Sequence, residues 1–252
     1  MQKQLAKNVW GPRTDFGLVR DEMLEQVQLH LLRHLGDYQT AYSDADGWAG
    51  RSREDGPPVD VLVVPPQGER RFAYVTSFGC SFRPLPAKSY EDQGVRRRVE
   101  FVLAAQQKGD PGADTAMLNL CANTVRQFAK LVHMNPVSVE PGETVAFSVD
   151  PKPIFPNTQQ VAFAFMEPRL PANGFSSMKL ANGEEVRFIA PVPVFREELD
   201  AAKQFGTTAL THALMVGGVT EMLDMKRAPV ARPVLPARKT WRKRIFGLFS
   251  RK

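Results

Sequence analysis

The stretch VDVLVVPPQGERRFAYVTSFGCS, residues 59–81, decides how this chain folds. Its first part, 59–64, is a run of mainly apolar and β-branched residues, and Phe72–Phe78 is a second run with aromatic and β-branched residues. Both compositions favour β-strands. Pro65-Pro66-Gln67-Gly68 stands between them and breaks the first strand. The stretch therefore predicts two strands that are joined as a hairpin.

Further strands are predicted towards the C-terminus by the same criteria. They cover 99–105, 144–149, 161–166 and 186–190, and the last follows an Asn182-Gly183 turn of the hairpin type. Pro191-Val192-Pro193 is expected to lead out of that strand. Two polar stretches without periodicity, 37–58 and 84–98, are expected to be loops.

Helices are predicted where apolar residues recur every three or four positions. One such segment is 18–35, and a longer one is capped by Asp114 and ended by Asn135-Pro136. Shorter helices are expected over 197–205 and 207–216. The order of the elements predicts one α/β domain, residues 18–225, with a mixed β-sheet flanked by helices. It is preceded by an N-terminal segment, 1–17, and followed by a proline-rich linker and basic tail, 226–252.

The charge of the chain is unevenly distributed. The 252 residues suit one domain with appendages, and the formal net charge is +6. Ten lysines and arginines and no acidic residue lie in 226–252, which leaves 23 basic against 27 acidic residues before them. Because the body of the chain is net acidic, a nucleic-acid-binding core is disfavoured and no nucleic-acid partner is expected.

Cysteine usage and hydropathy bear on the compartment. Cys80 and Cys121 are the only two cysteines, and both lie in apolar runs, which excludes a disulfide scaffold and a four-cysteine zinc site. The longest uncharged stretch, 204–220, is too rich in threonine and glycine to be a transmembrane helix. No secretory signal is recognisable at the N-terminus. These features predict a cytoplasmic protein.

Three residue pairs or sites offer chemistry, and each has a simpler structural reading. His30 and His34 have the spacing of two metal ligands on a helix, yet they flank the apolar stripe and are expected to lie at its rim. Cys121 is expected in the core, and His133, twelve residues along the same helix, is about 18 Å away by the helical rise. Cys80 directly follows a strand, as nucleophiles on strand-to-helix elbows do, although Pro84 prevents a helix from following at once. No catalytic site, cofactor or metal is therefore expected.

Four stretches together resemble a known family. They are VLVVPP at 61–66, FAYVTSFGCS at 72–81 with Arg83-Pro84-Leu85 after it, EFVL at 100–103, and EVRFIAPVP at 185–193 with Glu197-Glu198-Leu199 after it. In this order they resemble the suppressor of fused domain, over Val27 to Val216. The positions that match its motifs are Pro65, Pro66, Thr76, Gly79, Cys80, Ser81, Pro84, Pro193 and Glu198.

The motif at Gly79 and Ser81 has two readings. In the structural one, Gly79 has positive φ in a tight turn after the strand, and the hydroxyl of Ser81 closes that turn. In the other, both residues contact a partner directly.

The resemblance implies a non-enzymatic domain that binds other proteins. In animals the family restrains transcription factors, and its bacterial members are proposed as immunity proteins that neutralise polymorphic toxins. A lone domain of this size is similar to the bacterial type, so the resemblance implies a protein partner, with a toxin as the candidate. A membrane-recruited adaptor or regulatory protein that acts through the basic tail is one alternative, and a hydrolase that uses Cys80 is another.

The basic tail has a second pattern of its own. Trp241, Ile245, Leu248 and Phe249 fall at i, i+4, i+7 and i+8, one face of a helix, whereas Arg242, Lys243 and Arg244 crowd the polar side and Phe246 lies off the stripe. A solvated basic end is one interpretation. The other is an interfacial anchor on the anionic inner face of a membrane.

Overall fold

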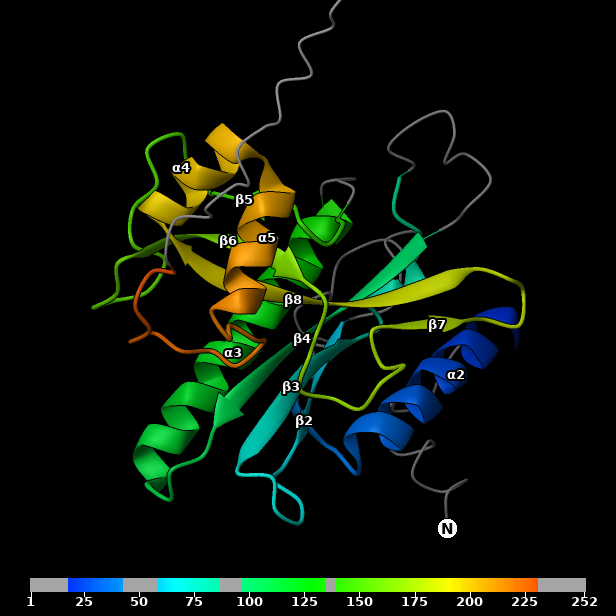
Figure 1. Ribbon diagram of the computed structural model, residues 1–252. Coiled ribbons are helices and arrows are strands. Elements are labelled where there is room, and N and C mark those ends of the chain that lie inside the picture. The colour runs from blue at the N-terminus through cyan, green and yellow to red at the C-terminus, as the bar shows by residue number, and fades with distance from the viewer. Residues whose placement is uncertain (1–17, 43–58, 87–96, 135–138, 231–252) are drawn as a thin grey trace, which may run out of the picture.

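The computed structural model describes residues 18–42, 59–86, 97–134 and 139–230 (Figure 1). It confirms the predicted α/β class, because helices cover a mixed sheet of eight strands. The strands are β1 (Gln39–Tyr42), β2 (Asp60–Val64), β3 (Phe72–Phe78), β4 (Arg97–Gln106), β5 (Thr144–Val145), β6 (Gln160–Met166), β7 (Ser177–Lys179) and β8 (Glu185–Phe195). The helices are α2 (Leu18–Leu35), the short 3-10 turn η2 (Cys80–Phe82), α3 (Pro111–Met134), α4 (Arg196–Phe205) and α5 (Thr207–Val216).

The sheet order is β1-β2-β3-β4-β8-β6-β5, and β7 also pairs with β8. Strands β2 and β3 form the antiparallel pair that the opening stretch of sequence predicts, with Asp60 opposite Phe78. Strands β4 and β8 are parallel neighbours, and every other pair in the sheet is antiparallel. β8 is thus the strand through which the two halves of the sheet are joined.

The helices divide between the two faces of the sheet because strand side chains alternate. Val61 and Phe101 pack with α3 on one face, whereas Leu62 and Phe188 pack with α2 on the other. The face that α2 covers continues along β8 to Val192, where α4 and α5 take over. Figure 1 shows β8 crossing the molecule, with α2 near one end and α4 and α5 near the other.

The predicted start of the long helix is wrong by one turn. Helix α3 begins at Pro111, which suits the first helical position because its missing N–H has no partner there. Asp110 is the cap, since its carboxylate accepts hydrogen bonds from the N–H groups of Gly112 and Ala113. Asp114 instead accepts from the backbone of the preceding loop, at Lys108 and Gly109. The expected end at Asn135-Pro136 lies outside the described residues.

Several strand predictions also differ from the structure. β1 lies inside the expected loop 37–58, and β7 is not predicted at all; both are short and depend on their neighbours for pairing. The expected strand 144–149 pairs only over Thr144–Val145, after which Phe147 is largely exposed. β4 begins at Arg97, inside the expected loop 84–98. β8 continues through the Pro191-Val192-Pro193 segment to Phe195.

Candidate functional site

The turn after β3 is built around one buried carboxylate, that of Glu100 on β4. Its Oε1 accepts hydrogen bonds from the backbone N–H of Gly79 at 3.0 Å, from the N–H of Ser81 at 2.9 Å and from the Ser81 hydroxyl at 2.6 Å. Its Oε2 accepts one from the Ser77 hydroxyl at 2.5 Å. Glu100 is completely buried, so these four donors replace the water that a carboxylate would otherwise bind.

This geometry supports the structural reading of the motif. Gly79 has φ +102°, as expected, in the region where a Cβ would be strained. The Ser81 hydroxyl is directed into the turn rather than outward, and burial raises the pKa of Glu100 while its four hydrogen bonds oppose that rise. The acceptor atoms of Glu100 are all engaged by the turn, which holds β3 and β4 together at this end.

Arg98, on the same strand as Glu100, holds the next part of the turn. Its Nη1 donates to the backbone carbonyls of Ser81, at 2.8 Å, and Phe82, at 2.6 Å. Its Nε donates to the carboxylate of Glu184 at 2.5 Å. Both side chains are nearly buried, so this ion pair ties η2 to the loop that precedes β8.

Cys80 does not have the surroundings of a nucleophile. It is fully buried in the core cluster under α3, and burial together with the nearby Glu100 raises the pKa of its thiol well above the ordinary value. Cys121 is also fully buried, as expected, and burial raises the pKa of its thiol too. Reactive cysteines are thiolates in partly exposed, electropositive surroundings, and these two are the opposite.

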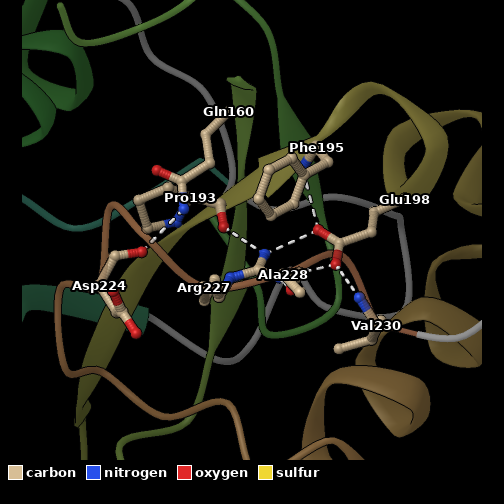
Figure 2. A network of polar contacts seen from close by, with 8 residues as sticks. All are labelled: Gln160, Pro193, Phe195, Glu198, Asp224, Arg227, Ala228 and Val230. Atoms are coloured by element: carbon tan, nitrogen blue, oxygen red, sulfur yellow. Dashed lines mark hydrogen bonds and ion pairs between the residues drawn. The ribbon is translucent and has the colours of Figure 1, made fainter. Parts of the chain in front are cut away.

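A second buried carboxylate, that of Glu198, organises the junction of β8 and α4 (Figure 2). Arg227 binds it with two hydrogen bonds, Nη1 to Oε1 and Nη2 to Oε2, both at 2.7 Å. The N–H groups of Phe195 and Val230 complete the shell at 2.9 and 2.8 Å. Only 2% of the Glu198 side chain is exposed, so the guanidinium is the charge that balances it.

The contact of Arg227 with β8 shows which edge of that strand is unpaired, and this explains why the strand tolerates prolines. Along a strand, the N–H and C=O of alternate residues point to the same edge. The carbonyl of Pro193 accepts from Arg227 Nη2 at 2.7 Å, and the N–H of Phe195 donates to Glu198, so this edge is the one away from β6. Pro191 lies on the same edge by alternation. No strand donates or accepts there among the described residues, and the missing N–H groups of the prolines leave no ladder bond unmade.

The residues after α5 form a C-terminal strap, defined here as 224–230. Its first residue accepts a hydrogen bond from Gln160 on β6, Arg227 lies 4.7 Å over the ring of Phe195, and Val230 packs beside Gly217. A Cβ at Gly217 would come within 2.6 Å of Val230, so only glycine leaves room for the strap. A linker starting at Lys226 is therefore not what the structure has: 226–230 belong to the folded unit.

The remaining motif residues have separate places. The carbonyl of Pro65 accepts from Arg70 Nη2 at 2.6 Å, and Thr76 is buried with its hydroxyl on the carbonyl of Ser77. Pro66 and Pro84 are both exposed, whereas Cys80 and Ser81 in the turn before Pro84 are buried. Of the motif positions, Gly79 and Ser81 lie at Glu100, and Pro193 lies with Glu198 at the second carboxylate. The tail positions 241–249 lie outside the described residues.

His30 and His34 lie at the rim of the α2 contact, as expected. The ring of His30 stacks on Phe188, with centroids 4.8 Å apart, and its Nε2 lies 2.9 Å from the carbonyl of Phe175. Burial lowers the pKa of both histidines. Within the described ranges, no three His, Cys, Asp or Glu side chains are grouped to hold a metal ion.

None of the helices in the ranges that the structure covers is long and apolar enough to span a bilayer.

Comparisons with known proteins identify the family of the chain. The family model described as "Suppressor of fused protein (SUFU)" matches residues 55–228, which include both carboxylate centres and Arg227 of the strap. The chain belongs to the suppressor of fused family. Among curated proteins none matches the chain.

Two solved structures that align with TM-scores above 0.5 have the same fold. A SUFU homologue from Neisseria gonorrhoeae FA 1090 aligns with TM-score 0.53 at 18% identity, over 84% of this chain and 96% of that one. The chain in a Sufu–Fu complex aligns with TM-score 0.53 at 14% identity, over 82% and 91%. Drosophila Suppressor of Fused gives TM-score 0.48 at 16% identity, over 83% of this chain and 50% of that one.

Replacing Arg227 by alanine should lower the free energy of unfolding by about 3–5 kcal/mol, because it leaves Glu198 buried and unpaired. Urea denaturation measures this. Arg227 binds the carboxylate of Glu198 and the carbonyls of Pro193 and Ala228. Arg196→Ala is the matched control, since Arg196 binds a carboxylate and a carbonyl, those of Asp150 and Pro151, at the surface. Its loss should cost about 1 kcal/mol or less. Equal losses for the two variants would contradict the assigned role of Arg227.

Both thiols should be inert in the folded protein and should react with a thiol reagent only after unfolding in urea. The rate of labelling, followed by absorbance and by mass spectrometry of the labelled peptides, measures this for Cys80 and Cys121 separately. Rapid labelling of Cys80 under native conditions would restore its candidacy as a nucleophile.

Proposed function

We propose that this protein is a non-enzymatic binding protein which holds one polypeptide partner, and that the partner is a toxin to which it confers immunity. The observation that carries the proposal is the use made of the family motif. Gly79, Ser81 and Glu198 are engaged inside the fold by hydrogen bonds that stabilise turns and strand ends. Residues used in this way stabilise the shape of the domain, and a binding protein recognises its partner through the shape of its surface.

Family membership supports the same proposal. One structure with this fold is that of a Sufu–Fu complex, in which the family member is bound to another protein. The acidic body of the chain, with 23 basic and 27 acidic residues before Lys226, suits a basic partner. Complementary charge accelerates encounter, and toxins that act on nucleic acid carry positive charge for that purpose.

Growth protection tests the proposal. Cells that produce the partner toxin should be rescued by co-expression of this protein, with toxin transcript unchanged, and the two purified proteins should form a complex of fixed stoichiometry. Rescue should require at least equimolar protein, because binding consumes one molecule for each toxin. Rescue by a small fraction of an equivalent would indicate catalysis and contradict the proposal.

Cys80→Ala separates binding from hydrolysis. The variant removes the thiol from a buried position and leaves the surface unchanged. Once its folding has been verified by urea denaturation, it should protect as well as the wild type. Loss of protection in a stably folded Cys80→Ala protein would favour the hydrolase alternative.

We also propose that the tail recruits this protein, as a cytoplasmic one, to the anionic inner face of a membrane. The pattern that favours it is the apolar stripe of Trp241, Ile245, Leu248 and Phe249 beside Arg242, Lys243 and Arg244. Each basic residue near such a surface contributes about 1 kcal/mol, and the stripe adds apolar burial.

Flotation with vesicles of phosphatidylserine and phosphatidylcholine measures this. The full chain should float, and a chain that ends at Val230, which keeps the strap and its Arg227–Glu198 pair, should not. Ile245→Ala with Leu248→Ala should abolish flotation, whereas Phe246→Ala, off the stripe, should leave most of it. A full chain that stays unbound at low salt would contradict the anchor.

A further inference from the structure

One edge of β8 changes its neighbour half-way along the strand. The N–H of Phe188 donates to the carbonyl of Ser176, next to β7, and two residues later Ala190 pairs with Met166 of β6. Even-numbered residues of β8 face this edge, so β7 and β6 follow one another along it. The loop 167–176 connects these two strands directly, and a gap is left at their meeting point.

A recess of about 70 Å³ lies at this meeting point. Its lining includes Glu167 at the end of β6, Ser176 and Ser177 at the start of β7, Glu185 on β8, and Pro141 as an apolar wall. Phe188 also borders the recess, but its side chain is fully buried in the core under α2. The volume suits the head group of one side chain and is too small for a cofactor.

The polar groups of the recess make few hydrogen bonds within the described part of the protein, and Glu167 and Ser177 are exposed to solvent. Within the part of the chain that the structure describes, Glu167 makes no ion pair or hydrogen bond through its side chain, and neither does the hydroxyl of Ser176 or Ser177. Glu185 uses only its Oε2 there, accepting from Arg187 Nε at 3.1 Å. Carboxylates accept only, and hydroxyls can accept as well as donate.

The one cation in the lining of the recess is already engaged among the described residues. Arg187 donates to Glu140 at 2.6 Å and to Glu185, and Glu140 also binds Arg97. The lining therefore holds two carboxylates against one arginine that is already committed. A ligand that enters must bring donors and positive charge, because an anion would meet Glu167 and Glu185 without a free cation.

We propose that this recess binds the cationic head of an arginine or lysine side chain from the protein's polypeptide partner. The guanidinium or ammonium group would reach the carboxylates and serine hydroxyls, while the alkyl stem lies along Pro141. This inference rests on the proposed binding function and assigns it one contact point. It also places the contact on the first half of β8, away from Glu198 and the strap near the end of that strand.

Titration with small cations tests the recess without a partner. N-acetyl-arginine amide or N-acetyl-lysine amide should produce saturable shifts in the ¹⁵N–¹H signals of Ser176, Ser177, Phe188 and Ile189. The citrulline analogue keeps the shape of arginine without its charge and should bind at least about tenfold more weakly, the ratio for one lost charge-assisted contact. Equal binding of citrulline, or no saturable shift with either cation, would overturn the proposal.

Paired variants provide the matched control. Glu167→Gln with Glu185→Gln should weaken binding of the cation amides at least about tenfold. The amide oxygen of a glutamine at position 185 can still accept from Arg187, so the fold should be kept, and amide spectra outside the recess verify this. Glu197→Gln removes one exposed carboxylate from α4 and should change nothing. Unchanged binding by the double variant would overturn the proposal.

The partner itself supplies a separate readout. If the double variant binds the toxin as tightly as the wild type does, the recess is not a contact point, and the proposed binding function still stands. If the wild type binds no polypeptide, the proposed function fails, whereas the amide titration continues to report on the recess alone. At least tenfold weaker toxin binding by the double variant, with Glu197→Gln unaffected, is the expected result.

Discussion

The structure depends on the way β8 changes partners along its length. Its first half lies between β4 and β7, and its second half pairs with β6 on one edge only. This exchange creates two local problems. Among the residues that the structure describes, one edge beyond Ile189 has backbone groups without a neighbouring strand, and the other edge has a gap where β7 gives way to β6. At the unpaired edge, Pro191 and Pro193 have no N–H to satisfy, and Arg227 of the strap binds the carbonyl of Pro193. The gap between β7 and β6 is the recess.

The two buried carboxylates, Glu100 and Glu198, are stabilised away from water in different ways. Glu100 is surrounded by neutral hydrogen-bond donors and has no cation beside it among the described residues. Burial raises the pKa of Glu100, and the hydrogen bonds from Ser77, Gly79 and Ser81 oppose that rise. Glu198 has a guanidinium at 2.7 Å in bidentate geometry and two backbone N–H groups besides. Breaking either arrangement leaves an unsatisfied buried carboxylate, which is more costly than the loss of an exposed ion pair.

The strongly patterned elements can be predicted well from the sequence. The bounds of α2 and β3 are those expected, because a clear helical period and an unbroken β-rich run leave few alternatives. β1 and β7 could not be predicted, since four and three residues carry no period and their pairing is supplied by β2 and β8. The passage of β8 through two prolines also depends on tertiary context, namely on which edge is unpaired.

The candidate site is harder to predict than the fold. Sequence reasoning identifies Gly79, Ser81 and Glu198 but not their partners, Glu100 and Arg227. A signal for Glu100 exists, because it is the only charged residue in the apolar run 99–105. Arg227 has none, since it stands among basic residues and prolines that look like a linker, and only the fold brings it to Glu198.

The central parallel pairing has a consequence for how the chain reaches this state. Arg98 and Glu184, which join the two halves, are 86 residues apart, so the sheet closes through a long loop and is expected to close late. Until then β8 presents an incomplete edge that could pair with another unfinished chain. Pro191 and Pro193 have no N–H to donate along that edge, so this part of β8 is a poor template for another strand.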